Sequence, residues 1–384
     1  MRFIHTADWH LGRLFYGVHL TEDQAHVLDQ VVGLVADAKP DAMLISGDIY
    51  DRAVPPPEAV DLLDDVFSRL VLSQRVPVIL IAGNHDSPNR LGFGSRLLAA
   101  QGLHVYGPLT VDPAQVRLGD AHGQVCIYPI TYAEPSVVRD RLACDSVVDH
   151  DTALRALLER VCPKQPAGQR SILVAHAFAS GGEVTESERP LSVGGSGTVS
   201  VSCFDGFNYV ALGHLHRAQS VESPRVQYAG SLMKYSFTEA SQAKSVNLVE
   251  MDRAGGCTVE RIALKPRRDA RCIEGNLQDL LRAAAAGDGR EDYLMVSLLD
   301  TGAILDPMAR LREVYPNVLH IERPALMREG ALDGTRRDHR EMSDERLFGD
   351  FFAQVTGNAP TGEEAVAYAT IVNEWRRKER EATG

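Results

Sequence analysis

The 384-residue sequence lacks the features that mark secreted, membrane and disulfide-rich proteins. No apolar run reaches the roughly 18 residues that a membrane-spanning helix needs. The six cysteines include no C-x-x-C pair, which argues against a disulfide framework and a cysteine zinc site. Residues 1–12 have no signal-peptide pattern and already contain Asp8 and His10. We therefore expect a cytoplasmic protein that does not act at a membrane.

Positive charge is also scarce, with 40 Lys and Arg against 52 Asp and Glu and a formal net charge of −12. A protein that binds nucleic acid unaided usually carries a basic surface. The sequence also lacks G-x-x-x-x-G-K-[S/T], which excludes ATP binding by a P-loop. If the substrate is a polyanion, metal ions, a partner or a local basic cluster must supply positive charge. The densest basic run is either a DNA contact or a solvated edge: Arg261, Lys265, Arg267, Arg268 and Arg271.

Apolar strands alternate with amphipathic helices in the first two thirds of the chain, which predicts a layered α/β fold. The two helices expected first span 21–38 and 58–72, and Thr21 and Gln24 are expected to form a capping box. Continuous apolar strands are typical of sheets that are covered on both faces. The expected strands are 2–5, 42–46, 76–82, 125–130, 172–175, 209–212, 245–251 and 257–264. The Gly-rich stretch 194–198 is either a connection or a DNA contact.

The composition changes near Lys265, where we expect a domain boundary. A strand–helix–strand–helix–strand pattern follows and predicts a small α+β domain over residues 265–325. Residues 326–342 are polar and are expected to form a linker. Two helices are expected within 343–384, and the last begins with a capping box of Thr361 and Glu364. Their apolar stripe either docks a partner or folds back on the chain.

Metal-ligand side chains follow five of the predicted strands. Residues just beyond the carboxyl ends of strands in such folds meet in one crevice. A single histidine at a strand end is usually structural, but five such elements in one order are not explained that way. We expect one metal site formed by Asp8, His10, Asp48, Asn84, His176, His214 and His216.

The chemistry of these ligands favours two divalent ions. Asp, Asn and His without thiolates suit Mn²⁺, Fe²⁺ or Zn²⁺. Seven donors exceed what one tetrahedral ion takes, and two ions about 3.5–4 Å apart share a bridging carboxylate. Asp48 lies in the middle of the set and is the expected bridge. Glycines at 47, 83 and 213 are expected to let the backbone turn as the strands end.

The order of these motifs, D-x-H, G-D-x-x-D, G-N-H-D, H and G-H-x-H, resembles the calcineurin-like metallophosphoesterase superfamily over residues 1–250. Within it, the chain is most similar to the SbcD family, the nuclease subunits of bacterial SbcCD DNA-repair complexes. The segments that carry this likeness are 4–12, 47–52, 204–207, 211–216 and 229–231. After residue 265 the likeness is mainly one of layout.

The resemblance implies a layered αββα sandwich with a capping domain and C-terminal helices. It implies that Asp8, His10, Asp48 and His216 hold one ion and that Asp48, Asn84, His176 and His214 hold the other. Mn²⁺ is the ion that the resemblance favours. His85 is then placed to protonate the leaving oxygen or to position the phosphate, rather than to bind metal.

The loop residues Asp51 and Arg52 depart from the closer relatives, which place a histidine where Asp51 stands. The G-D-x-x-D-R pattern resembles instead the phosphoprotein phosphatase branch, where the second Asp orients the catalytic His and the Arg contacts phosphate. We expect Asp51 to pair with His85 and fix its tautomer. The alternatives are that Asp51 only caps the loop and that Arg52 is an ordinary surface charge.

The function that follows is a metal-dependent DNA exo/endonuclease, nucleoid-associated, that acts with an ATPase. The resemblance implies an SbcC-type subunit docked on residues 343–384, a capping domain at 265–325 and a nuclease domain at 1–264. It also implies a homodimer within a heterotetramer, with contacts through helical faces at 60–71 and 91–100. The alternatives are a phosphatase or small phosphodiesterase on the same fold and a non-catalytic scaffold. The complete ligand set argues against the scaffold.

Overall fold

The computed structural model describes residues 1–112, 115–161, 168–191, 197–283, 289–302, 304–324, 344–356 and 358–383. The predicted linker 326–342 and residues 194–196 of the Gly-rich stretch lie outside them. The chain divides into two compact units, Met1–Asp269 and Ala270–Gly384. The finer division predicted from the sequence stays a prediction.

The first unit is built on two six-stranded sheets. The first sheet has the order β16 (Cys257–Ala263), β15 (Ser245–Met251), β1 (Arg2–Thr6), β4 (Ala42–Ile45), β5 (Val78–Ile81) and β6 (Leu103–Tyr106), in which the last four strands are parallel and β15 is antiparallel to both of its neighbours. In the second sheet the four central strands are parallel and each edge strand is antiparallel to its neighbour, in the order β13 (Gln219–Val221), β14 (Ser223–Tyr228), β12 (Tyr209–Gly213), β9 (Arg170–His176), β8 (Gly123–Ile130) and β7 (Val116–Asp120).

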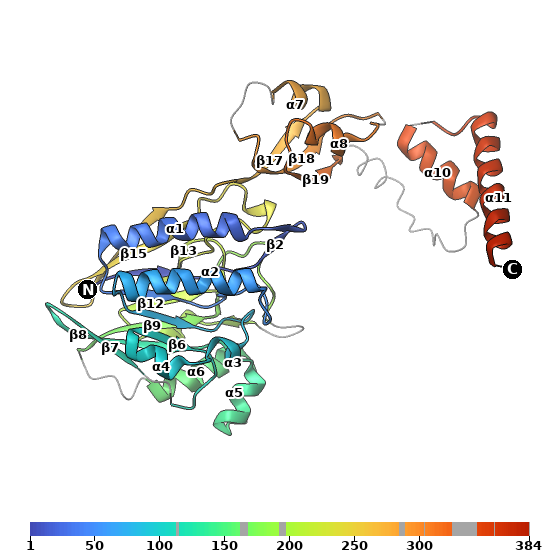
Figure 1. Cartoon of the computed structure of the whole chain (residues 1–384). Coiled ribbons are helices and arrows are strands. Elements are labelled where there is room, and N and C mark those ends of the chain that lie inside the picture. Colours follow the sequence, from blue (N-terminus) through green and yellow to red (C-terminus); the bar gives the residue numbers. More distant parts are fainter. Residues whose placement is uncertain are drawn as a thin grey trace. The chain divides into compact units, whose positions relative to one another are not determined.

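Helices cover the outer faces of these sheets (Figure 1). On the first sheet lie α1 (Thr21–Ala38) and α2 (Pro57–Phe67), which continues as the π-helix Ser68–Ser73. On the second lie α5 (Pro135–Leu142) and α6 (His150–Val161). The shorter elements are β2 (Leu14–Phe15), β3 (Val18–His19), α3 (Pro88–Leu91), α4 (Ser95–Leu98), η2 (Ala99–Gln101), β10 (Phe178–Ala179), β11 (Thr198–Val199), η4 (Val201–Phe204) and η5 (Phe237–Glu239). The predicted α/β fold of layered sheets and helices is confirmed.

The core of the first unit lies between the two sheets. Phe3, Leu44 and Ile79 of the first sheet pack against Ile172 and Tyr209 of the second, and all five are fully buried. Because both faces of each sheet are covered, the central strands are continuously apolar, as the sequence predicted. This packing brings the carboxyl ends of both sets of parallel strands to one end of the unit.

The capping box predicted at Thr21 and Gln24 is wrong. Helix α1 does begin at Thr21, but Leu20 precedes it and no side chain caps it. Gln24 is buried, and its amide donates instead to the carbonyl oxygens of Trp9 (3.1 Å) and His10 (2.8 Å). The side chain of Gln24 therefore holds the loop after β1 in place and does not cap the helix.

The second unit contains a parallel sheet of β17 (Ala270–Gly275), β18 (Tyr293–Leu298) and β19 (Val318–Glu322). Helices α7 (Leu277–Ala283) and α8 (Pro307–Arg312) bury Leu280 and Leu311 against it. Two further helices are α10 (Asp344–Thr356) and α11 (Gly362–Thr383). The predicted capping box of Thr361 and Glu364 is confirmed by reciprocal bonds. No helix among the described residues is long and apolar enough to span a bilayer.

Candidate metal centre

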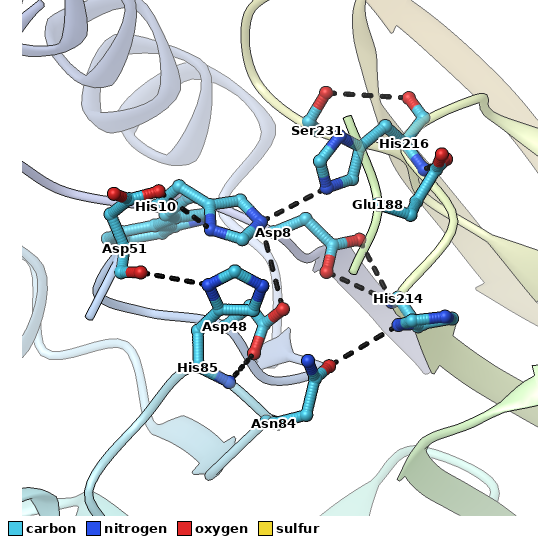
Figure 2. A network of polar contacts seen from close by, with 12 residues as sticks. Asp8, His10, Asp48, Asp51, Asn84, His85, Glu188, His214, His216 and Ser231 are labelled. Carbon is cyan, nitrogen blue, oxygen red and sulfur yellow. Dashed lines mark hydrogen bonds and ion pairs between the residues drawn. The ribbon is translucent and has the colours of Figure 1, made fainter. Parts of the chain in front are cut away.

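The side chains predicted to act as ligands gather at the carboxyl ends of strands from both sheets (Figure 2). The loops after β1, β4 and β5 of the first sheet contribute Asp8, His10, Asp48, Asn84 and His85. The second sheet contributes the last residue of β9 and two residues after β12, which are His176, His214 and His216. The ligands from the two sheets therefore face one another, although up to 208 residues separate them in the sequence.

Four of these residues have backbone in the left-handed region. The φ angle is 53° at Asp8, 46° at His10, 49° at Asp48 and 106° at His214. A non-glycine residue in such a conformation costs about 1–3 kcal/mol, and such residues concentrate at functional sites. Main-chain bonds keep the loops in place, since Asp8 N–H donates to the Gly47 carbonyl (3.1 Å) and His10 N–H to that of Asp48 (3.0 Å).

The three glycines act differently from one another. Only Gly47 has a positive φ, of 89°, as the turn predicted there requires. Gly83 and Gly213 are needed for space instead. A Cβ at Gly83 would lie 2.1 Å from Asp48 Oδ1, and one at Gly213 would lie 1.9 Å from the Ser46 carbonyl oxygen. The expectation of a sharp backbone turn is therefore wrong for these two, which let the neighbouring loops approach closely.

One group of donor atoms lies around His10. The Nε2 atoms of His10 and His216 are 3.0 Å apart, and His10 Nε2 is 3.7 Å from Asp48 Oδ2. Donor atoms of Asp8, His10 and His216 all lie within 4.8 Å of one another. These are the residues assigned above to the first ion.

The second group lies around Asn84. Its Oδ1 is 2.8 Å from His176 Nε2 and 3.3 Å from His214 Nδ1. Asp48 Oδ2 is 3.5 Å from His176 Nε2, so one carboxylate oxygen approaches both groups. This central position is what a bridging ligand needs. Asp8 also approaches the second group, since its Oδ1 is 3.9 Å from His176 Nδ1. The assignment of each residue to one ion stays a prediction.

The hydrogen-bond pattern leaves unprotonated nitrogens facing the centre. His176 Nδ1 is 2.9 Å from the Ser46 carbonyl oxygen, which can only accept, so Nδ1 carries the proton. Its neutral ring then directs the Nε2 lone pair at the oxygen of Asn84. Ligands that form bonds of about 2.1 Å to one ion lie about 3 Å apart, like these atoms. The residues therefore fit a divalent ion between them.

The charge balance also fits a bound cation. Burial and then the nearby Asp48 raise the pKa of Asp8 well above its usual value. Burial and then the nearby His216 hold the pKa of His10 well below its usual value, so its ring is neutral. His10 Nδ1 is buried and forms no hydrogen bond with any described residue. A divalent ion would offset the buried carboxylates and accept neutral imidazoles as ligands.

His85 is oriented by the main chain of Asp51. Its Nδ1 lies 2.8 Å from the Asp51 carbonyl oxygen, while its own N–H donates to Asp48 Oδ1 (2.9 Å). The Asp51 carboxylate accepts from Arg13 (2.9 Å) and lies 3.6 Å from His10 Nδ1. The expected pairing of this carboxylate with His85 is therefore replaced by a carbonyl contact, which still fixes the tautomer. The catalytic roles of both residues stay predictions.

Arg52 is exposed, and its guanidinium donates to the Gly12 carbonyl at 3.5 Å. A phosphate contact by Arg52 stays a prediction. The basic run is largely paired, with Arg267 to Glu22 (2.6 Å) and Arg268 to Asp23 (3.0 Å). These ion pairs favour the solvated-edge interpretation of the run over a DNA contact.

Residues outside the predicted set complete the site. Asp86, the last residue of G-N-H-D, accepts from the main-chain N–H groups of Ile49 (3.1 Å), Tyr50 (2.9 Å) and Gly83 (2.9 Å). It ties the loop after β4 to the loop after β5. Burial and then Asp48 raise the pKa of Asp86 to about 7. Its place in the motif was a usable signal.

A second set that the sequence analysis missed surrounds His216. Glu188 accepts from the His216 main-chain N–H (2.8 Å), and Ser187 Oγ lies 2.5 Å from His216 Nδ1. Glu239 and Lys244 lie behind Ser187 as a buried ion pair (2.5 Å). Burial raises the pKa of Glu239, but the nearby imidazole of His216 and the charge of Lys244 bring it down to about 2. No motif joins these residues in the sequence.

Comparison with known protein families shows to which family the chain belongs. Residues 1–218 match the calcineurin-like phosphoesterase family. The chain belongs to this family. Residues 266–356 match the family described as the type 5 capsule protein repressor C-terminal domain, SbcD_C. The two matches together make the chain an SbcD-like member of the calcineurin-like phosphoesterases, and therefore a metallophosphoesterase. Its buried Asp and His groups are consistent with two metal ions.

Solved structures of low identity also resemble the chain. They include the calcineurin-like phosphoesterase YfkN from Bacillus subtilis, with 11% identity, 69% of this chain and 90% of that chain covered, and a TM-score of 0.37. A dimetal phosphatase from Danio rerio has 15% identity, 69% and 99% coverage and a TM-score of 0.39. GAP50 of Plasmodium, described as the anchor in the inner membrane complex, has 13% identity, 70% and 90% coverage and a TM-score of 0.41.

Proposed function

We propose that this chain is a DNA nuclease that hydrolyses phosphodiester bonds with two divalent ions. The observation that carries the proposal is the order of the two family matches, a calcineurin-like phosphoesterase over 1–218 and an SbcD_C domain over 266–356. A small phosphate ester needs no such additional domain. The substrate is therefore a polymer, and double-strand ends and hairpins are the DNA forms that the SbcD likeness favours.

The residues of the site have separate proposed roles in binding metal, transferring a proton and contacting phosphate. Asp8, His10, Asp48, Asn84, His176, His214 and His216 would hold the ions. When bound, the ions supply Lewis-acid activation of the phosphodiester, and Mn²⁺ is the ion proposed. His85 is half-buried and its Nδ1–H donates to the Asp51 carbonyl, so Nε2 is the nitrogen that faces the substrate and, when the ring carries a second proton, gives that proton to the leaving oxygen. Arg52 is proposed to contact a phosphate.

The proposed partner is an SbcC-type ATPase subunit. The chain has a net charge of −12 and no P-loop motif, so a second protein must supply the ATP site and much of the DNA affinity. Helices α10 and α11 expose Phe351 (64%), Val366 (66%) and Ile371 (66%), which suits a docking surface.

A homodimer is the proposed assembly within the complex. The apolar side chains Val60, Leu72, Phe93 and Leu98 are exposed around a hollow of about 710 Å³ that α2, its π-helix and residues 87–105 line. Two copies of this surface could cover each other and place two sites near two DNA strands.

Labelled DNA tests the proposed reaction directly. The full chain would be incubated with Mn²⁺ and an end-labelled duplex or hairpin, alone and with the ATPase partner and ATP. p-Nitrophenyl phosphate and bis-p-nitrophenyl phosphate would be assayed in parallel. His85→Ala is the active-site variant, and His122→Ala, at an exposed position, is its matched control.

Cleavage of DNA that requires Mn²⁺ and His85, and that ATP stimulates in the complex, is the expected result. Hydrolysis of the small esters beside intact DNA would overturn the nuclease proposal and make the chain a phosphatase or small phosphodiesterase of the same family.

A further inference from the structure

A surface strap, residues 183–190, lies beside His216 of the metal centre. Glu188 attaches the strap to the loop after β12, since its Oε1 accepts from the His216 N–H (2.8 Å), and its Oε2 accepts from the Thr185 N–H within the strap (2.6 Å). Arg13 also donates to the Ser187 carbonyl at 3.4 Å. These contacts place the side chain of Ser187 directly against the imidazole of His216 (Figure 2 shows His216 with Glu188).

The hydroxyl of Ser187 sets the direction of the hydrogen bonds. It contacts Glu239 Oε1, and a carboxylate can only accept, so the hydroxyl proton points to Glu239. Ser187 Oγ must then accept from His216 Nδ1 at 2.5 Å. His216 Nδ1 therefore carries a proton, and its Nε2 lone pair faces His10 Nε2, 3.0 Å away.

The carboxylate of Glu239, which accepts from Ser187, is held in place by a buried ion pair with Lys244. Glu239 is fully buried and Lys244 is 7% exposed, and Glu239 Oε2 lies 2.5 Å from Lys244 Nζ. The same ammonium donates to the His216 carbonyl at 2.8 Å. A buried ion pair is a poor way to gain stability, because removing both charges from water costs about as much as their attraction returns. A role in positioning accounts for it better.

The other cluster is arranged differently. His176, on β9, directs its Nδ1 proton to a main-chain carbonyl, Ser46, inside the two-sheet core. Among the described contacts, only the cluster of His10 and His216 is held by a side chain from the strap, the half-buried Ser187. A change in the strap should therefore affect one ion and spare the other.

We propose that Ser187 and Glu239 are positioning residues that fix the tautomer and ring orientation of His216 and thereby set the affinity of one of the two metal positions. The proposal rests on the proposed role of His216 as a ligand. Outer partners of metal-bound histidines typically contribute 10–100-fold to metal affinity. The strap thus becomes part of the metal site without touching an ion.

Calorimetric titration of the full, metal-free chain with Mn²⁺ tests this. The wild type should bind two ions. Ser187→Ala should bind one of them about 10–100-fold more weakly and the other unchanged. Ser187→Thr keeps the hydroxyl and should restore the lost affinity. Glu239→Gln should weaken the same ion, and Ser220→Ala, on an exposed strand residue, should leave both unchanged.

Thermal unfolding of each metal-free variant shows that it has folded. An isotherm of Ser187→Ala that matches the wild type, an equal loss at both positions, or no rescue by Ser187→Thr would overturn the proposal. The titration does not involve DNA. If the wild type binds two ions and never cleaves DNA, the proposed function fails while the role of Ser187 stands.

Discussion

His85 contacts the loop after β4 at two points: its ring donates to the Asp51 carbonyl oxygen, and its main-chain N–H donates to the Asp48 carboxylate. No carboxylate oxygen among the described residues accepts from its ring. The sequence identified the correct neighbour, Asp51, but could not identify the atom. Side-chain type says which residues can pair, whereas the loop conformation decides whether the carboxylate or the carbonyl faces the ring. At Asp51 the carboxylate turns to Arg13 instead.

Replacing Asp51 should therefore be mild and replacing His85 severe. Asp51→Asn keeps the carbonyl and loses a partly exposed ion pair worth about 1 kcal/mol, so we expect less than about a tenfold loss of rate. His85→Ala removes a general acid and should cost about 10²–10⁴-fold. Turnover of labelled DNA and of bis-p-nitrophenyl phosphate checks both. Equal losses of rate in the two variants would contradict this expectation and would show that the Asp51 carboxylate takes part in catalysis.

Gly83 is the residue where a single methyl group should damage the metal centre. A Cβ there would lie 2.1 Å from Asp48 Oδ1 and 2.3 Å from Asp48 N, so the backbone of the proposed bridging residue must move. We expect Gly83→Ala to weaken Mn²⁺ binding by at least about 10–100-fold, which titration measures.

Gly119→Ala is the matched control for Gly83→Ala, since no atom lies within 4 Å of the added methyl group. If Gly83→Ala bound Mn²⁺ as tightly as this control, Asp48 could not depend on the close approach of the two loops.

At the scale of elements, apolar runs identified the central strands well, and the ligand motifs identified which loops carry the site. The same reasoning missed α5, which buries only Val138 and Leu142, and α6, although its apolar stripe of Ala153, Leu154, Leu157, Leu158 and Val161 was a usable signal. It assigned Gln24 to a helix cap because the local pattern allowed it. In the fold Gln24 is buried and donates to carbonyl oxygens of the loop after β1. Ser187 and Glu239 are 52 residues apart and share no motif, so only folding brings them together.

A buried ion pair joins β7 to β9 and should make stability depend on pH. Arg170 donates to both oxygens of Asp120 (2.8 and 2.5 Å), and the two side chains are 5% and 8% exposed. The hydrogen bonds from Arg170 hold the pKa of Asp120 well below its ordinary value. Because the folded-state pKa is lowered, this contribution is complete above about pH 4 and is lost as the pH falls toward the folded pKa.

We expect Asp120→Asn to lower the free energy of unfolding by about 3–5 kcal/mol at pH 7, because it leaves Arg170 buried and unpaired. The difference from the wild type should shrink below about pH 4. Glu250→Gln, in the exposed pair with Arg2, is the control and should cost less than about 1 kcal/mol. Thermal and denaturant unfolding across pH measure both; a difference that does not change with pH would contradict the ion-pair account.

At the scale of the whole molecule, the acidic charge and the missing P-loop predicted dependence on a partner, while the layout after residue 265 predicted where that partner binds. The sequence could suggest an apolar face on the last helices but could not say how it packs. Phe348 stacks on Tyr368 with ring centroids 4.0 Å apart, which ties α10 to α11 and still leaves Phe351 exposed.

Phe351→Ser should therefore abolish binding of the ATPase subunit without changing hydrolysis of bis-p-nitrophenyl phosphate. Co-elution of the two proteins on size exclusion and ATP-stimulated DNA cleavage are the readouts. Leu305→Ser removes another exposed apolar side chain (89%) and should leave complex formation intact. Undiminished binding by Phe351→Ser would place the partner on another surface.

The left-handed backbone at Asp8, His10, Asp48 and His214 has a consequence for how quickly ions enter and leave. Loops that already have their final shape need no folding step when an ion arrives. Association should then be limited by the loss of water from the ion, and exchange at each of the two metal positions should be single-exponential. An enzyme of this design would follow the ion content of its surroundings closely, so that the metal supply would determine the active fraction at any moment.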